Sequence, residues 1–348
     1  MSRFFVYRKG LSVINALMLF VALAIILLGA TVFTNGLEWF GKKLNLSDGA
    51  VGSIFAAVGT ALPETIIPVI AILFGSRDTG HSIGIGAIIG APFMLGTLAF
   101  FISGAAVFLN RKKRDDYPIM RVDPIVMRRD MEYFLVLYFV AIICTFLHHP
   151  VLRVSIAIIL VLSYGAYVLL TLKCEGNSCE PVEESVLDPC FFAPKSHDPH
   201  FFIILAQVGS SLLLIVWGAH IFVEKIQIIS QLLGVSPFIL SMIIAPIATE
   251  LPEKFNSVIW INKGKDTLAI GNITGAMVFQ GSVITALGIL MTEWKLTHAA
   301  FVTALLTFAS VGLAYGQIKL KKTLTPSTLL IGGAFYSVFI ILVLSGHI

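Results

Sequence analysis

Charged side chains are scarce in this chain. Asp, Glu, Lys and Arg make up 13% of its 348 residues, whereas a soluble domain carries about twice that share. Hydrophobic residues make up 57%, and the mean hydropathy is +0.91. So few polar side chains cannot cover a water-exposed surface. The composition therefore excludes an ordinary soluble protein and indicates an integral membrane protein.

Motifs for several kinds of chemistry are also missing. No G-x4-G-K-[ST] loop occurs, which argues against transport powered by ATP hydrolysis on this chain. Cys174, Cys179 and Cys190 do not have a standard zinc spacing, so we expect reduced thiols, with a metal-sensing loop as the lesser alternative. No nucleophile–base pair accompanies the carboxylates described below. We therefore expect no enzymatic activity and no resident cofactor, and the net charge of +4 gives no reason to expect a nucleic-acid partner.

Apolar runs long enough to cross a membrane recur along the whole chain. About 20 residues are needed for one helical crossing. We expect helices over residues 13–34, 49–74, 82–109, 130–147, 151–172, 201–223, 237–262, 267–290, 297–316 and 326–346. The predicted fold class is an all-α membrane protein of about ten transmembrane helices, with no room for a soluble catalytic domain.

The chain carries one motif twice. Leu-Pro-Glu at 62–64 and again at 251–253 lie 189 residues apart, each within a long apolar run. A gapless alignment of 29–64 with 218–253 also matches Gly29, Ala30, Phe33, Leu44, Ser47, Ala56 and Thr60 with identical residues. After a four-residue shortening of the second copy, Gly86, Gly90 and Gly96 match Gly271, Gly275 and Gly281. We interpret this as an internal duplication.

Five helices per copy predict an inverted-topology repeat, because an odd number makes the second copy enter from the opposite side. We expect repeats over 1–172 and 201–348, joined by a cytoplasmic linker over 173–200. The face with the loops after the odd-numbered helices carries 16 Lys and Arg, and the opposite face carries 7. By the positive-inside rule, we expect both termini outside, in the inner or plasma membrane of the cell.

Two carboxylates near mid-membrane depth are the strongest functional signal, because a charge there is costly and usually functional. Thr60 and Glu64 lie four apart and share a helical face, while Pro63 removes a backbone hydrogen bond, so nearby carbonyls can turn toward a ligand. Thr249 and Glu253 repeat this arrangement. Oxygen donors of this kind suit hard cations such as Ca²⁺ or Na⁺. The alternative is that the prolines only kink the helices and each Glu pairs structurally.

The second copy adds polar residues that the first copy lacks. Asn272 and Gln280 lie on the predicted helix 267–290, where the first copy has Ala87 and Leu95 at the aligned places. Glu250 and Lys254 lie four apart, so they can pair along one helix face. Glu250 would tune the charge of the site or carry a coupling proton. Lys254 would act as an internal cation in the coupling, or else contact a neighbouring helix.

Gly59-Thr60-Ala61-Leu62-Pro63-Glu64 and Ala248-Thr249-Glu250-Leu251-Pro252-Glu253, each followed by a Gly-x3-Gly helix, resemble the two alpha-repeats of the sodium/calcium exchanger family. The chain is similar to a divergent, prokaryotic-type member of that family. The resemblance implies a cation antiporter whose second, third, seventh and eighth helices form the site. It also implies Ca²⁺-coordinating roles for Thr60, Glu64, Thr249 and Glu253, and a sliding motion of the first and sixth helices.

The chain departs from the family pattern at positions that the family uses mainly for Na⁺. Ala61 and Glu250 stand where serine is usual, and Leu95 and Gln280 replace Asn or Asp. We expect an antiporter that exchanges Ca²⁺ or a related divalent cation for Na⁺ by alternating access. The alternatives are a proton-coupled antiporter for Ca²⁺, Mn²⁺ or Mg²⁺ and, less favoured, a cation channel. The expected partners are inorganic cations and membrane lipid.

Overall fold

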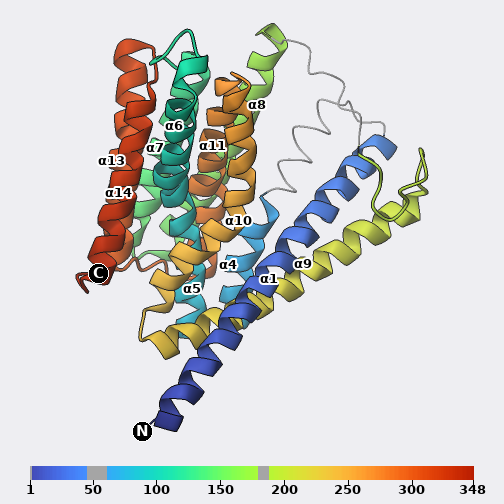
Figure 1. The fold of residues 1–348 in the computed structure, drawn as a ribbon, viewed down its shortest axis with the longest axis vertical. Helices are drawn as coiled ribbons and strands as arrows, with labels where there is room; N and C mark the ends of the chain where they lie inside the picture. The colour runs from blue at the N-terminus through green and yellow to red at the C-terminus, as the bar shows by residue number, and fades with distance from the viewer. Residues whose placement is uncertain (1, 45–60, 179–187) are drawn as a thin grey trace. The chain divides into compact units, whose positions relative to one another are not determined.

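We analysed a computed structural model of the chain. It describes the backbone of residues 2–44, 61–178 and 188–348, and the side chains of residues 14–44, 61–171, 188–250 and 257–348. All regular structure within these ranges is helical. In chain order the helices are α1 (Ser2–Lys43), α4 (Leu62–Phe74), α5 (Arg77–Met94), α6 (Phe100–Leu109), α7 (Pro124–Ile143), α8 (Pro150–Ser178), α9 (Phe201–Leu233), α10 (Pro237–Asn262), α11 (Asp266–Phe279), α12 (Thr285–Met291), α13 (His298–Lys321) and α14 (Pro326–Leu344) (Figure 1).

Where the structure describes them, the apolar ranges expected from the sequence fall on helical stretches, and the first part of the range 49–74 lies outside the described residues. Among the described residues, seven helices are long and apolar enough to cross a membrane by length and composition. The all-α prediction and the prediction of several membrane spans are confirmed. The count of ten spans stays a prediction, because α4 and the range Pro237–Glu250 are apolar but shorter.

Local chemistry sets several helix ends. Asp123 caps α7, accepting hydrogen bonds from the backbone N–H of Ile125 (2.8 Å) and Val126 (3.4 Å). Thr297 caps α13 in the same way. The helix α9 ends at Gly234, whose φ of +68° is readily adopted by glycine. Prolines do not end α10, which continues through Pro246 and Pro252. The described backbone of α10 is therefore one continuous helix over Pro237–Asn262.

The chain forms two compact units, and each takes segments from both predicted repeats. One consists of residues 1–84 and 170–237, and the other of residues 85–169 and 238–348. In the first unit, α1 and α9 lie side by side and run in opposite directions, and α4 packs against α9 (Figure 1).

The contact between α1 and α9 is reciprocal. A Cβ on Gly29 would lie 2.7 Å from Ile215 Cγ1, and a Cβ on Gly218 would lie 2.8 Å from Ile26 Cγ1. A shift of 189 residues turns Gly29 into Gly218 and Ile26 into Ile215. The same two residue types thus make the same contact twice, as in a two-fold symmetric interface.

The second part of the predicted linker packs against this helix pair. Gln207 Nε2 on α9 donates to Asn35 Oδ1 on α1 (3.0 Å), and Gln207 Oε1 accepts from Phe192 N (3.0 Å). Cys190 is fully buried beside Gln207. Asp198 is paired with Lys43 at 2.5 Å, which holds the pKa of Asp198 below its usual value. Residues 188–200 are therefore anchored rather than a freely solvated connection.

The second unit contains a close helix pair, α5 and α10. The glycines Gly86 and Gly90 of α5 lie directly against the backbone carbonyls of Phe238 and Met242 on α10, so even a methyl group would not fit. The first Gly-x3-Gly face thus lets two helix backbones pack in direct contact, as small residues do in membrane proteins. The glycines of the second face, at 271 and 275, meet side chains of α7 and α8 instead.

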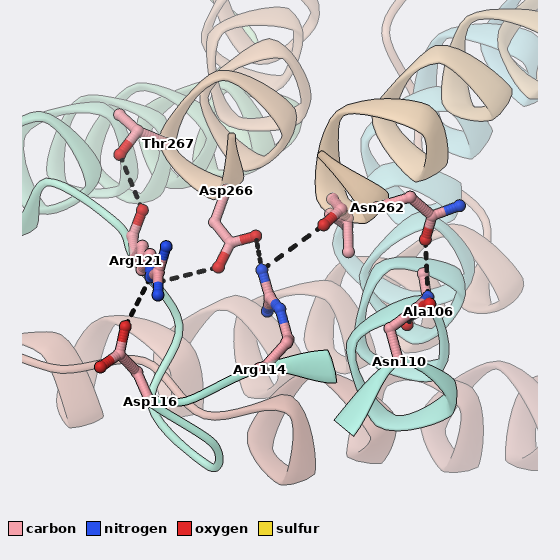
Figure 2. Close-up of polar contacts among 9 residues, drawn as sticks. Ala106, Asn110, Arg114, Asp116, Arg121, Asn262, Asp266 and Thr267 are labelled. Carbon is pink, nitrogen blue, oxygen red and sulfur yellow. Dashed lines mark hydrogen bonds and ion pairs between the residues drawn. The ribbon is translucent and has the colours of Figure 1, made fainter. Parts of the chain in front are cut away.

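The segment between α6 and α7 is held at the start of α11. Asp266 is fully buried there and accepts hydrogen bonds from the Arg114 guanidinium and from the backbone N–H of Arg121 (2.8 Å) (Figure 2). Thr267 Oγ1 donates to the carbonyl of Arg121 (3.1 Å), and Asn110 Nδ2 donates to Asn262 Oδ1 (2.6 Å). These contacts fix the beginning of α11, the helix that carries the polar residues of the candidate site.

Candidate functional site

The centre of the candidate site is a buried carboxylate on α10. Glu250 is completely buried, and Gln280 is 1% exposed. Gln280 begins the π-helical segment η5 (Gln280–Ile284) and donates a hydrogen bond from Nε2 to Glu250 Oε1. The structure thus brings together two predicted site residues that lie 30 positions apart. A carboxylate so deeply buried must be compensated by a cation, a proton or several donors.

Two further predicted residues lie on the same helices. Thr249 is 3% exposed, and its hydroxyl donates to the carbonyl of Ala245 (3.1 Å), so its oxygen lone pairs stay available to a ligand. Asn272 is half-buried on α11. Asn272 lies eight positions before Gln280, with seven residues of α11 between them, which is about 12 Å along a helix axis.

The π-helical segments occupy matching positions in the two copies. The first, η2 (Leu95–Ala99), begins at Leu95, which aligns with Gln280 at the start of η5. Thr97 donates to the carbonyl of Phe93, and Ser282 donates to the carbonyl of Val278, so the aligned hydroxyls make the same bond. Such bulges widen a helix locally and are frequent at functional sites. The segment η5 places the amide of Gln280 in the protein interior, whereas η2 places the side chain of Leu95 there.

Glu64 lies in the other compact unit, in the first turn of α4. Pro63 lies in the same turn, where a missing N–H costs no helical hydrogen bond. Pro68 lies inside α4 and removes one backbone donor there. Next to Glu64, the Thr65 hydroxyl donates to the carbonyl of Ala61 (2.6 Å).

Three predicted residues lie outside what the structure describes. Thr60 precedes the described part of α4, and the side chains of Glu253 and Lys254 are not described although their backbone belongs to α10. Their roles, and the expected pairing of Glu250 with Lys254, stay predictions. Gln280 is one partner of Glu250.

Sequence reasoning missed a second buried polar cluster. Asp130 on α7 is 2% exposed and accepts hydrogen bonds from Tyr167 of α8 (3.0 Å) and Thr274 of α11 (2.9 Å). Its neighbour Arg129 forms an ion pair with it at 3.0 Å, and the guanidinium lies 5.4 Å from the Tyr167 ring centre. The cluster ties α11 to α7 and α8.

A sequence signal for this cluster existed. An Arg-Asp pair at positions 129 and 130 stands at the very start of an apolar run. The sequence predicts a helix that begins at residue 130, which leaves Arg129 in the preceding basic segment, whereas α7 begins more than a full turn earlier, at Pro124. The pair is therefore inside the helix.

Within the described part of the chain, no three His, Cys, Asp or Glu side chains gather as a closed metal site. Cys144 and Cys190 are buried free thiols. The described donors are one carboxylate with an amide, and nearby hydroxyls. Such a mixed oxygen set matches transient binding of a hard cation better than permanent chelation by nitrogen and sulfur.

Comparison with known proteins identifies the family. The sequence profile of the sodium/calcium exchanger proteins matches residues 14–173 and 203–345, which is most of the chain. The chain belongs to this family. Members of the sodium/calcium exchanger family are transporters, so the chain is an integral, multi-pass membrane transporter and not an enzyme.

The individual relatives have low sequence identity to this chain, but the alignments cover most of its length. The chain is 24% identical over 282 residues to the "Putative antiporter CaxA" of Alkalimonas amylolytica, covering 80% of this chain and 82% of that one. It is 23% identical over 252 residues to the "Inner membrane protein YrbG" of Escherichia coli, covering 72% of each.

Solved structures of exchangers share the fold. The structure superposes on the H⁺/Ca²⁺ exchanger CAX with a TM-score of 0.71 at 16% identity, covering 95% of this chain and 82% of that one. It superposes on the sodium-calcium exchanger NCX_Mj with a TM-score of 0.56 at 19% identity, covering 95% and 99%. At this identity the likeness concerns the fold alone.

Proposed function

We propose that this chain is a secondary antiporter that exchanges Ca²⁺, or a related divalent cation, for Na⁺ by alternating access. The observation that carries the proposal is the fully buried carboxylate of Glu250, held by Gln280, in a member of the sodium/calcium exchanger family. A buried carboxylate in a membrane transporter has few uses besides binding a cation or a proton.

The proposed architecture is ten transmembrane helices in a five-plus-five inverted repeat. Three observations support it: the reciprocal glycine contacts between α1 and α9, the π-helical segments at aligned positions, and the match of the family profile in two segments. A chance resemblance between the two halves would not reproduce the same contact and the same helix irregularity. Inverted repeats are the usual basis of alternating access.

In the proposed site, Glu64 and Glu253 bind the divalent ion together with the hydroxyls of Thr60 and Thr249. Glu250, Gln280 and Asn272 tune the site and hold the competing ion, and Lys254 contributes to coupling. The support is the chemistry of these side chains and the burial of Thr249 and Glu250 on α10.

Coupling follows from the cost of buried charge. An ionised carboxylate without a cation is expensive to carry through the membrane interior. The site therefore changes its access easily only when it is occupied, so one ion must replace the other. This physical argument makes exchange obligatory and disfavours free conduction through a channel.

A proton-coupled antiporter is the second candidate. The observation that favours it is the neutral amide of Gln280 beside Glu250 at a position where the family usually has Asn or Asp. A carboxyl group in contact with an amide donor is stable both ionised and protonated, so Glu250 can exchange a proton in place of a sodium ion. The name of one structural neighbour, an H⁺/Ca²⁺ exchanger, is consistent with this coupling.

The deciding experiment is ⁴⁵Ca²⁺ uptake into proteoliposomes that contain the purified chain. One set has an outward Na⁺ gradient and the other an outward H⁺ gradient. We expect saturable uptake driven by Na⁺. Uptake driven only by H⁺ would establish the second candidate, whereas uptake that needs no counter-ion and does not saturate would indicate a channel. If no ⁴⁵Ca²⁺ uptake occurs under either gradient, Ca²⁺ is not the substrate. Mn²⁺ and Mg²⁺ are then tested in the same assay.

The same assay tests the site. Glu64→Gln and Glu253→Gln should each abolish uptake, because each removes a negative charge that the divalent ion needs. The matched control is Glu224→Gln, since the Glu224 side chain on α9 is 62% exposed. Full activity in both site variants would refute the assignment of the site while leaving antiport itself intact.

A further inference from the structure

The basic residues between α6 and α7, and those at the start of α7, fall into two classes. Four arginines are paired with carboxylates, as Arg114 with Asp266, Arg121 with Asp116, Arg128 with Glu132 and Arg129 with Asp130. These four contacts hold the loop and the helix in place. Their charges are already compensated within the protein.

Five other cations near this loop form no ion pair with any residue that the structure describes. They are exposed, and they are Arg111, Lys112, Lys113, Lys263 and Lys265. The first three follow α6, and the last two lie in the turn between α10 and α11. The unpaired cations thus come from two segments about 150 residues apart in the sequence.

The fold gathers these cations by anchoring the first segment at both ends. Asn110, just before the three cations, donates to Asn262, just before Lys263 (2.6 Å) (Figure 2). Arg114, just after them, binds the carboxylate of Asp266. The three cations between these anchors must therefore lie beside the turn that carries Lys263 and Lys265.

The gathered segments have an excess of positive charge. Residues 110–116 and 262–266 contain six basic and three acidic residues, a net charge of +3. Asp266 is buried and forms an ion pair with Arg114, and Asp116 forms an ion pair with Arg121. The third carboxylate, Asp115, is exposed and forms no ion pair with a described residue, so one carboxylate remains to compensate five exposed cations.

Exposed apolar side chains flank both segments. Phe108 and Leu109, at the end of α6, are 41% and 78% exposed, and Ile259 and Leu268 are about half exposed on the helices beside the turn. The Arg111 guanidinium lies 4.3 Å from the Phe108 ring centre, so this charge sits directly at the edge of an apolar surface. In a membrane protein such a boundary lies at the level of the lipid headgroups.

We propose that this cluster, formed by Arg111, Lys112, Lys113, Lys263 and Lys265, is a binding site for the phosphate headgroup of an anionic phospholipid. The cations bind the phosphate, and the exposed apolar side chains beside them contact the acyl chains. A soluble anion would use the cations but not the apolar surface, so the structure favours a lipid. Because the turn 262–266 joins α10 to α11, the lipid would bind next to the two helices that carry Glu250 and Gln280.

The test measures lipid retention by native mass spectrometry of the full chain released from nanodiscs that contain phosphatidylcholine and phosphatidylglycerol. The variants are Lys112→Gln/Lys113→Gln and Lys263→Gln/Lys265→Gln. The matched control is Lys321→Gln/Lys322→Gln, which removes two exposed charges at the end of α13. Attraction of roughly 1 kcal/mol per basic residue predicts about thirtyfold weaker phosphatidylglycerol binding for each double variant and no change for the control.

Selective retention of phosphatidylglycerol that is lost in both cluster variants and kept in the control would support the site. Equal loss in all three double variants would overturn it, because it would mean a general effect of charge. Equal retention of phosphatidylcholine and phosphatidylglycerol by the unaltered chain would also overturn it. Complete displacement of the lipid by millimolar inorganic phosphate would assign the site to a soluble anion. Circular dichroism of each variant checks that the helices are intact.

Discussion

At the scale of single residues, Glu250 and Asp130 are buried carboxylates whose described surroundings differ. Glu250 is bonded by a neutral amide, whereas Asp130 is bonded by a guanidinium, a phenol and a threonine hydroxyl. Arg129 compensates the charge of Asp130 with a fixed cation. We therefore assign Asp130 to the packing of α11, whereas ion exchange at Glu250 is the role proposed above.

Asp130→Ala should destabilise the protein strongly. The substitution leaves Arg129, whose side chain is only 16% exposed, without its carboxylate, and an unpaired buried charge costs about 3 kcal/mol or more. Equilibrium unfolding in mixed micelles measures the loss. The matched control is Glu293→Ala, which breaks an ion pair whose side chains are 63% and 77% exposed, and exposed pairs contribute at most about 1 kcal/mol.

Two variants of Thr274 measure the contribution of its hydroxyl separately from that of the Asp130 carboxylate. Thr274→Ser keeps the donor to Asp130 and should unfold like the unaltered chain, whereas Thr274→Val removes it and should lose about 1 kcal/mol or more. If Asp130→Ala and Glu293→Ala unfold alike, the cluster does not anchor α11.

At the scale of helices, the packing of α1 and α9 depends on two glycines. Gly29 and Gly218 each let an isoleucine of the other helix approach within the space that a Cβ would need. The helices α1 and α9 correspond to each other in the two predicted repeats, so each contributes one glycine and one isoleucine to the same kind of contact. Small residues allow such close approach in membranes.

Gly218→Ala should weaken the α1–α9 pair. The added methyl group would lie 2.8 Å from Ile26 Cγ1, and overpacking of this kind costs typically about 1–3 kcal/mol. Gly209→Ala on the same helix is the matched control, because a Cβ there meets nothing within 4 Å. It should be neutral or slightly stabilising, since alanine favours the helix over glycine.

Thermal unfolding of both variants in the same detergent gives the comparison. Gly29→Ala should behave like Gly218→Ala, because the two contacts are equivalent. A neutral result for both would mean that the helices separate at no cost, which contradicts close packing of this pair.

At the scale of the whole molecule, the proposed topology places both termini on the side opposite the basic loop. Sixteen Lys and Arg lie on one predicted face and seven on the other. Among the described residues, five of the sixteen are in ion pairs with carboxylates, namely Lys43, Arg114, Arg121, Arg128 and Arg129. The positive-inside rule counts basic residues and gives Asp and Glu little weight, so the prediction is unchanged by this pairing.

Reporter fusions measure the orientation directly. Alkaline phosphatase fused after Ile348 should be active, because the enzyme folds only outside the cytoplasm, and a fusion after Lys113 should be inactive. A green fluorescent protein at the same two positions should give the opposite pattern. An active phosphatase at Lys113 together with an inactive one at Ile348 would reverse the proposed orientation.

The sequence by itself determined the class of this protein. Hydropathy predicts membrane helices because the bilayer core admits no unpaired backbone, and α10 runs over the very residues expected, Pro237–Asn262. The repeated Leu-Pro-Glu motif and its glycines indicate the family, which the profile match confirms. The site residues Glu250 and Gln280 were expected individually from their polarity at apolar positions.

Only the tertiary structure decided which side chains meet. The hydrogen bond from Gln280 to Glu250 and the cluster around Asp130 join helices that are distant in the sequence, and helical periodicity does not say which faces of two helices touch. The same holds for the basic residues. In the sequence, Arg114 and Lys113 are equivalent neighbours in one charged run, but in the structure one is paired with Asp266 and the other is exposed. Pairing depends on the distance between helix ends, which packing sets and local sequence does not.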